Sequence, residues 1–315
     1  MIKTSNKKCQ FEFNWLFALI IGAVILFLAI FFASRLISTS QYQGEAELVR
    51  EFDILLNPFS SVGAVGTITL AKEVSMPSAI TINLSCSSDG LGKDSIRMMS
   101  KSDALTPEYA IYNKYIFGEN LSGKSFYVFG MPLEMPFRID DMIYIVSEDY
   151  CFVNPPQKIK DEISILNGSK IISVESLGQC PSDSKKVCFG NAQCDIKVTC
   201  DGNDAECEKG AVSKQGTVYF YKRSLMYAAI FSDTSLYKCN IKRLLARAES
   251  IADVYQQKGY RLATDCEMYG ITTALTAFKT KAEILKSSLS PDIRTVATEA
   301  DNLERADMAA RCPVY

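Results

Sequence analysis

The chain of 315 residues contains no histidine. Histidine is the most common general base in enzymes and the most common protein ligand of transition metals. Its absence excludes Ser–His and Cys–His catalytic pairs and every histidine-based metal site. No two cysteines have the CxxC spacing of thioredoxin-like redox sites or zinc ribbons. The glycine clusters at 62–66 and 90–93 lack the spacing of a nucleotide-binding loop. We therefore expect no cofactor and no metal, and the sequence favours a protein that is not an enzyme.

Strong net charge is also missing. Lysine and arginine total 34 while aspartate and glutamate total 36, so the chain has no electrostatic field that would recruit nucleic acid. Long apolar runs are absent with one exception, WLFALIIGAVILFLAIFFA, which extends from Trp15 through Gly22 to Ala33 without a charged residue. A helix of this length rises about 28 Å, close to the hydrocarbon thickness of a bilayer. In lipid, only a helix satisfies its own backbone hydrogen bonds within such a segment. The sequence therefore predicts a transmembrane helix at 14–37, with the lipid bilayer as its partner.

A cleaved signal peptide is the main alternative for this run. Its apolar part is usually about 7–15 residues and ends at a small-residue cleavage site, and no such site follows Ala33. Basic residues lie mainly before the run, where Lys3, Lys7 and Lys8 stand, whereas Arg35 is alone behind it. Because basic residues stay preferentially on the cytoplasmic side, we expect a single-pass cell-membrane protein with a cytoplasmic N-terminus. Residues after about 38 are expected to be extracytoplasmic.

Cysteine is abundant, with eleven residues of which only Cys9 precedes the apolar run. An even number of cysteines in an oxidising compartment indicates disulfide bonds, and the spacing of the dense group after residue 180 fits no zinc site. Three N-x-S sequons, at Asn83, Asn120 and Asn167, are compatible with an outside location. The candidate disulfide cysteines are Cys86, Cys151, Cys180, Cys188, Cys194, Cys200, Cys207, Cys239, Cys266 and Cys312.

Alternating apolar and polar residues predict a series of strands between about 65 and 221. These patterns occur at 65–70, 79–86, 125–129, 142–147, 170–176, 194–200 and 216–221. Residues 158–166 predict an amphipathic helix between the strands at 142–147 and 170–176, so this segment forms a strand–helix–strand unit that permits a parallel pair. The strand at 216–221 is the expected partner of the strand at 194–200.

From about 233 onward the apolar residues recur every three or four positions, which predicts helices with stripes at 241–255, 271–289 and 293–303. Gly259 is expected to end the first helix as a C-cap. The third helix is expected to have Ser290 as its N-cap and Pro291 as its first helical residue. Asp292 is expected to interact favourably with the positive end of the helix dipole. The short connections indicate antiparallel neighbours.

The predicted fold class is α+β. It comprises an N-terminal transmembrane helix, a mixed β-sheet ectodomain with one strand–helix–strand unit, and a C-terminal antiparallel helical subdomain. The expected domains are a cytoplasmic tail at 1–13, the transmembrane helix at 14–37, a juxtamembrane helix at 38–59, a β-rich disulfide-bonded ectodomain at 60–222 and a helical subdomain at 223–315.

The segment KKCQFEF at 7–13 resembles the N-terminus of archaeal type IV prepilins. Those proteins have a basic leader, a small residue before the peptidase cut, and Gln and Glu ahead of a hydrophobic helix. Two lysines, Gln10 and Glu12 stand in roughly corresponding places here, whereas Cys9 stands where the family has Gly or Ala. The resemblance covers residues 7–33 and extends to uncharacterised archaeal single-pass membrane proteins. It implies a pilin-like subunit of a surface filament.

These features together predict a membrane-anchored extracytoplasmic protein with a structural, adhesive or binding role at the cell surface. A protein or glycan partner, or self-association, is expected. Two alternatives stay open: the pilin-like subunit, and an extracytoplasmic hydrolase or redox protein. Carboxylate pairs such as Asp140–Asp141 and Glu148–Asp149 would suit a glycosidase, although such pairs are equally common in turns.

Overall fold

The structure of the protein is a computed structural model. The residues that it describes are 15, 17–35, 70–100, 108–166, 168, 170–190, 193–202, 205–262, 269–289, 291–310 and 312–315. The predicted tail at 1–13, the predicted juxtamembrane helix at 38–59, Cys9 and Cys266 lie outside these residues. The chain divides into two compact units, Met1–Leu48 and Val49–Tyr315.

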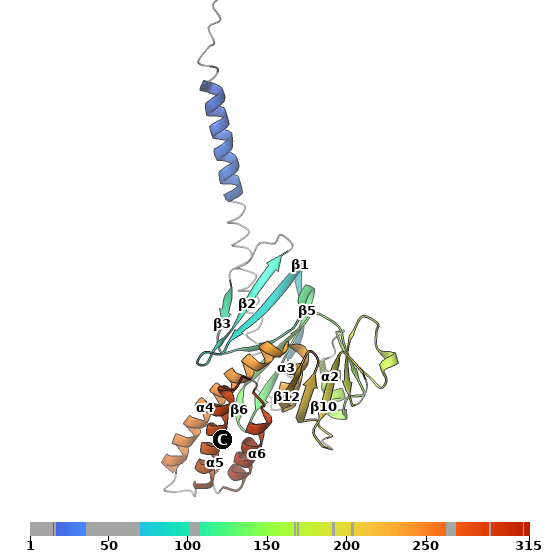
Figure 1. Ribbon diagram of the computed structural model, residues 1–315, viewed down its shortest axis with the longest axis vertical. Helices are drawn as coiled ribbons and strands as arrows, with labels where there is room; N and C mark the ends of the chain where they lie inside the picture. Colours follow the sequence, from blue (N-terminus) through green and yellow to red (C-terminus); the bar gives the residue numbers. More distant parts are fainter. Residues whose placement is uncertain are drawn as a thin grey trace, which may run out of the picture. The chain divides into compact units, whose positions relative to one another are not determined.

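The described part of the first unit is Trp15 and the helix Phe17–Arg35 (Figure 1). It is long and apolar enough to cross a membrane, with a mean hydropathy of 2.8, and none of that apolar window is buried. Trp15 and Ala33 are exposed, and nothing lies within 4 Å of a Cβ added at Gly22. The window that would cross the membrane is thus apolar on every side of the helix.

The second unit is α+β, as predicted, but it contains two mixed sheets. The first sheet has the strand order β3 (Tyr109–Ile111), β2 (Lys93–Ser100), β1 (Leu70–Ser87), β5 (Leu121–Glu134), β6 (Arg138–Val146) and β4 (Tyr115–Phe117). Its strands pair antiparallel except for β4 with β6. The second sheet has the order β12 (Thr217–Tyr221), β11 (Lys209–Ser213), β10 (Ile196–Cys200), β9 (Lys185–Phe189), β7 (Tyr150–Val153) and β8 (Ile171–Val174). Its last four strands, β10, β9, β7 and β8, pair in parallel. Strand β11 pairs antiparallel with both β10 and β12.

The strand–helix–strand unit is present, but its first strand differs from the prediction. Helix α2 (Gln157–Leu166) connects β7 to β8, which pair in parallel, whereas residues 142–147 fall mainly in β6 of the other sheet. All four residues of β7 are buried. A strand covered on both faces shows no alternation, so its short sequence YCFV carries no period-two signal. Similarly, β11 separates β10 from the strand at 216–221, which the prediction had paired directly.

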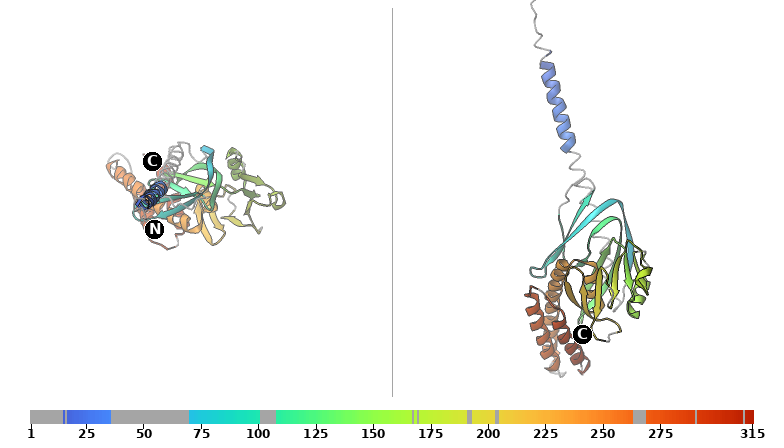
Figure 2. Two further views of the ribbon diagram at one scale, coloured as in Figure 1. Left: turned by 90° about the horizontal axis from the view of Figure 1, so that it is seen from above. Right: turned by 45° about the vertical axis from the view of Figure 1, so that its right-hand side comes forward.

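Helix α3 (Arg223–Phe231) occupies the centre of the second unit. All nine of its residues are buried, and it contacts β5 and β6 of one sheet and β11 and β12 of the other (Figures 1 and 2). The Phe231 ring packs edge-on against Phe129 at 5.6 Å and against Tyr150 at 4.9 Å, centroid to centroid. These aromatic contacts join α3 to both sheets, so one core runs through the unit.

Three helices follow α3, with α4 packed against α5 and α5 against α6 (Figure 1). They are α4 (Thr234–Leu262), α5 (Tyr269–Lys286) and α6 (Arg294–Met308). The expected end of the first at Gly259 is wrong, because this buried glycine lies inside α4. Helix α6 begins later than expected, at Arg294, whose amide donates to the Asp292 carboxylate at 3.1 Å. Ser290 lies outside the described residues.

Disulfide bonds tie these elements together. The structure pairs Cys86 with Cys239, Cys151 with Cys180, Cys188 with Cys194 and Cys200 with Cys207. Cys312 is also disulfide-bonded. The first bond joins β1 to α4 across 153 residues, whereas the last two close short loops. The predicted boundaries at 60–222 and 223–315 stay predictions.

Candidate functional site

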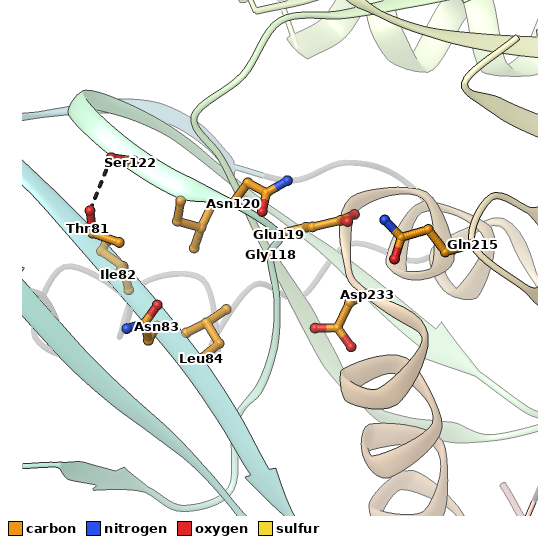
Figure 3. Close-up of a pocket in the computed structure, with 11 residues that line it drawn as sticks. Thr81, Ile82, Asn83, Leu84, Gly118, Glu119, Asn120, Ser122, Gln215 and Asp233 are labelled. Atoms are coloured by element: carbon orange, nitrogen blue, oxygen red, sulfur yellow. Dashed lines mark hydrogen bonds between the residues drawn. The ribbon is translucent and has the colours of Figure 1, made fainter.

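A polar pocket of about 540 Å³ opens where turns of both sheets meet the start of α4 (Figure 3). Strand β1 and the connection between β4 and β5 form one side. The turn between β11 and β12 and the residue before α4 form the other. The lining residues are Thr81, Ile82, Asn83, Leu84, Gly118, Glu119, Asn120, Leu121, Ser122, Gln215 and Asp233.

Strand pairing and one unusual turn residue build the β1 side. In the pairing of β1 with β5, Ile82 lies opposite Leu121 and Thr81 lies opposite Ser122. The hydroxyl oxygens of Thr81 and Ser122 are 3.1 Å apart. Asn120 precedes β5 with φ 51°, a left-handed conformation that asparagine adopts more readily than most residues. This turn leaves the Asn120 side chain exposed at the pocket.

A buried lysine fixes the opposite side. Lys214 Nζ lies 2.7 Å from Glu119 Oε2 and donates to the Ile230 carbonyl at 3.2 Å and to the Ser232 carbonyl. These carbonyls end α3, where the helix dipole favours a cation. Burial lowers the pKa of Lys214, although Glu119 opposes the shift. The lysine thereby joins the second sheet to the first and fixes the position of Gln215 next to it.

Both carboxylates of the pocket are already committed to structural bonds. Glu119 is paired with Lys214, and Asp233 caps α4 by accepting the amides of Ser235 at 2.8 Å and Leu236 at 2.9 Å. The groups left to meet a ligand are therefore carboxamides. Within the described part of the chain, no side-chain bond engages the amides of Asn120 or Gln215.

The amide of Asn83 makes only a weak contact, to Met99 Sδ at 3.9 Å. Each of the three carboxamides can donate two hydrogen bonds and accept others through its oxygen. In Figure 3 they approach the pocket from three different segments of the chain. The arrangement thus presents both donors and acceptors and adds no unpaired charge.

Residues 118–125, GENLSGKS, have the G-x-x-x-x-G-K-S spacing of a phosphate-binding loop. That motif needs a strand, a loop and then a helix, whose free backbone amides cradle the phosphates. Here the second half of the segment belongs to β5 and pairs with β1. Because the sheet fixes this backbone, the segment is not a phosphate-binding loop.

A second polar cluster lies fully inside the protein, between β2 and α4. Arg243 Nη1 lies 2.9 Å from Asp94 Oδ2 and donates to Asn240 Oδ1 at 2.7 Å, and its guanidinium sits 4.6 Å from the centre of the Tyr115 ring. Burial raises the pKa of Asp94 to about 6, against the opposing effect of Arg243. Arg243 is 0% exposed and Asp94 is 1% exposed, so this cluster is sealed from solvent. Its ion pair joins β2 to α4.

Among the residues singled out from the sequence, the sequon asparagines Asn83 and Asn120 line the pocket, whereas the candidate catalytic carboxylates do not. None of the candidate cysteines that the structure describes lines it. The carboxylate pair Asp140–Asp141 is engaged in ion pairs with Arg247 and Arg138, each at 2.8 Å. Among the described residues, no group of three or more His, Cys, Asp or Glu side chains is placed to hold a metal.

Sequence reasoning missed the pocket because its walls come from four segments that are distant along the chain. Asn83, Asn120 and Gln215 have no mutual spacing that a motif would reveal. Two of the pocket residues, Asn83 and Asn120, do share a local feature, because each begins the tripeptide Asn-Leu-Ser. No protein-family profile, curated protein or solved structure matches the chain.

Proposed function

We propose that the chain is a single-pass, membrane-anchored extracytoplasmic protein that binds a neutral, hydroxyl-rich ligand, such as a surface glycan, in the polar pocket. The anchor is the helix Phe17–Arg35. Its apolar window has no buried residue, and an apolar surface of this size and length matches the bilayer interior. The disulfide bonds of the second unit fit an oxidising compartment, and the basic tail fits a cytoplasmic N-terminus.

The ligand class is inferred from three carboxamide side chains that line one cavity, those of Asn83, Asn120 and Gln215. A carboxamide both donates and accepts hydrogen bonds, as a sugar hydroxyl does, so the two groups are complementary. The cavity volume of about 540 Å³ lies within the range of small-ligand sites. Because Glu119 and Asp233 are held by other bonds, the pocket favours binding over acid–base hydrolysis.

The pilin-like subunit is the second candidate. The same exposed helix would pack against helices of other copies in a filament core instead of crossing lipid. The prepilin-like segment at 7–13 supports this reading, and it predicts a mature chain that starts at Gln10. An intact N-terminus, seen by mass spectrometry of the protein isolated from its membrane, favours the anchor.

The ligand is tested with purified full-length protein in detergent on an array of immobilised neutral oligosaccharides. We expect binding to at least one of them. The double variant Asn120→Ala/Gln215→Ala should weaken this binding about tenfold, because each amide contributes roughly one hydrogen bond of about 0.5–1.5 kcal/mol. Asn113→Ala is the matched control: Asn113 is also an exposed asparagine with positive φ, at 55°, and lies outside the pocket lining.

Three results would contradict the ligand proposal. The first is an array without a binding partner, and the second is binding that the double variant leaves at the level of Asn113→Ala. The third is a covalent glycan on Asn120 of the native protein, seen as an added mass on its peptide. Asn120 begins a sequon, and a glycan attached there would cover the pocket.

A further inference from the structure

The disulfide bond between Cys86 and Cys239 lies next to the polar pocket and connects its two sides. Cys86 follows the pocket residue Leu84 on β1 by two positions, about 7 Å along the strand. Cys239 follows the pocket residue Asp233 by six positions, about 9 Å along α4. Strand β1 forms one side of the pocket, and the residue before α4 belongs to the other side (Figure 3). The bond therefore holds the two sides of the pocket together.

The same bond lies beside the residue that supports the connection between β4 and β5. Cys86 Sγ is 3.7 Å from Asn240 Oδ1. The buried Asn240 donates through Nδ2 to the Ile116 carbonyl at 3.2 Å. Ile116 lies two residues before Gly118, where this connection begins to line the pocket. The bond thus supports β1 and α4 directly and, through Asn240, the segment that carries Asn120.

The Cys86–Cys239 bond also differs in burial from the other disulfide bonds. Among the four bonds for which the structure describes both cysteines, it is the one in which neither cysteine is buried, since Cys86 and Cys239 are each half-buried. Each of the other three bonds contains one cysteine that is 0% exposed, and these cysteines are Cys151, Cys188 and Cys207.

This difference in burial affects the reactivity of the bonds. In disulfide exchange a thiolate attacks one sulfur, and the other sulfur leaves as a thiolate. A fully buried sulfur is hard to reach, and apolar surroundings disfavour its departure as a thiolate. In the Cys86–Cys239 bond, either sulfur can be attacked and either can leave. We therefore expect a reductant to cleave this bond before the other three.

We propose that the Cys86–Cys239 bond is a redox switch that controls ligand binding in the polar pocket, a role that rests on the proposed binding function. The reductant is a dithiol. Its first thiolate forms a mixed disulfide with one cysteine while the other leaves and takes up a proton, and its second thiolate then displaces the first cysteine. Two electrons and two protons thereby pass from the dithiol to the protein, which gains two thiols while the dithiol becomes a disulfide. Ligand binding must then order the loosened pocket, so the reduced protein binds more weakly.

The test treats oxidised full-length protein in detergent with increasing dithiothreitol and then with an alkylating reagent. Peptide mass spectrometry identifies the cysteines that have become free. We expect Cys86 and Cys239 to be alkylated before the cysteines of the other three bonds. Amide hydrogen exchange in the partly reduced protein should be at least about tenfold faster at 81–84 and 118–122, with β9 and β10 unchanged.

A neutral oligosaccharide that binds on the array should bind the partly reduced protein about tenfold more weakly. The alkylation and exchange measurements need no ligand, so they test the switch even if the array identifies no oligosaccharide. Failure of the switch and failure of the proposed binding function are therefore distinguishable.

The variant Cys86→Ala/Cys239→Ala lacks the bond permanently. Its pocket segments should exchange as those of the partly reduced parent do, with no further response to the same dithiothreitol concentration. Cys200→Ala/Cys207→Ala is the matched control, because it removes a short-loop bond of the second sheet, and it should keep the full response. Earlier cleavage of any of the other three bonds overturns the proposal, as does unchanged exchange at 81–84 and 118–122 after cleavage of the Cys86–Cys239 bond. Equally faster exchange in β9 and β10 also overturns it, because the bond would then stabilise the whole unit and not the pocket.

Discussion

Arg243→Met is expected to lower the free energy of unfolding by about 3–5 kcal/mol. The substitution keeps most of the side-chain volume but removes the guanidinium that pairs with the Asp94 carboxyl. Asp94 is then left in the interior with the Ile116 amide, 2.9 Å from its Oδ2, as its main support. Loss of one member of a buried ion pair leaves the other uncompensated, and that penalty is larger than the pair's own attraction. Urea denaturation at neutral pH under non-reducing conditions measures the change.

Arg97→Met is the matched control for Arg243→Met. Arg97 lies on β2, as Asp94 does, but its pair with Glu108 is long at 3.5 Å and both side chains are more than 40% exposed, at 44% and 46%. Exposed pairs of this kind contribute about 0–1 kcal/mol. The double variant Asp94→Asn/Arg243→Met should recover part of the lost stability, because it removes both charges. If Arg243→Met costs no more than Arg97→Met, the buried cluster does not join β2 to α4 as described.

The double variant Cys86→Ala/Cys239→Ala should lower the free energy of unfolding by up to about 5 kcal/mol. The bond it removes spans 153 residues and connects β1 of the first sheet to α4. A cross-link over a long loop restricts the unfolded chain strongly, and the loss of entropy grows with loop length. The other disulfides within this loop shorten it, so this value is an upper estimate.

Cys200→Ala/Cys207→Ala provides the comparison for the long-range bond. Its cysteines are 7 residues apart, and the same relation gives a loss of about 2 kcal/mol. Both double variants are compared by denaturant unfolding of the oxidised proteins. An equal loss in the two variants, or a larger one for Cys200→Ala/Cys207→Ala, would contradict a special role of the bond between β1 and α4.

The parts of the fold that were predictable from sequence are those with one buried face. The stripes at 241–255 and 271–289 identified α4 and α5, because each helix has a polar side that creates a period. Helix α3 was missed for the opposite reason. Its sequence RSLMYAAIF is buried all round, and a short run without a polar face cannot be distinguished from a buried strand. The central element of the core is therefore the one with the weakest sequence signal.

The candidate sites were less predictable than the fold. The polar pocket depends on which turns meet in space, and Gln215 shows no sign in the sequence that it faces Asn120. Asp94 and Arg243 are 149 positions apart, and only the packing of α4 against the first sheet makes them partners. Local patterns report periodicity and caps, whereas these contacts depend on tertiary structure. Residues 118–125 show the opposite case. Their sequence has the spacing of a phosphate-binding loop, but the pairing of β5 with β1 excludes phosphate binding by this backbone.

The most direct test of a membrane-anchored extracytoplasmic protein is the labelling of lysines on intact cells with a membrane-impermeant amine reagent, read by mass spectrometry of the isolated protein. We expect modification of exposed lysines after the helix, such as Lys124 and Lys158, before lysis. The tail lysines Lys3, Lys7 and Lys8 should react only after lysis, which makes them an internal control. Labelling of the tail lysines on intact cells, with Lys124 and Lys158 protected until lysis, would contradict the proposed topology.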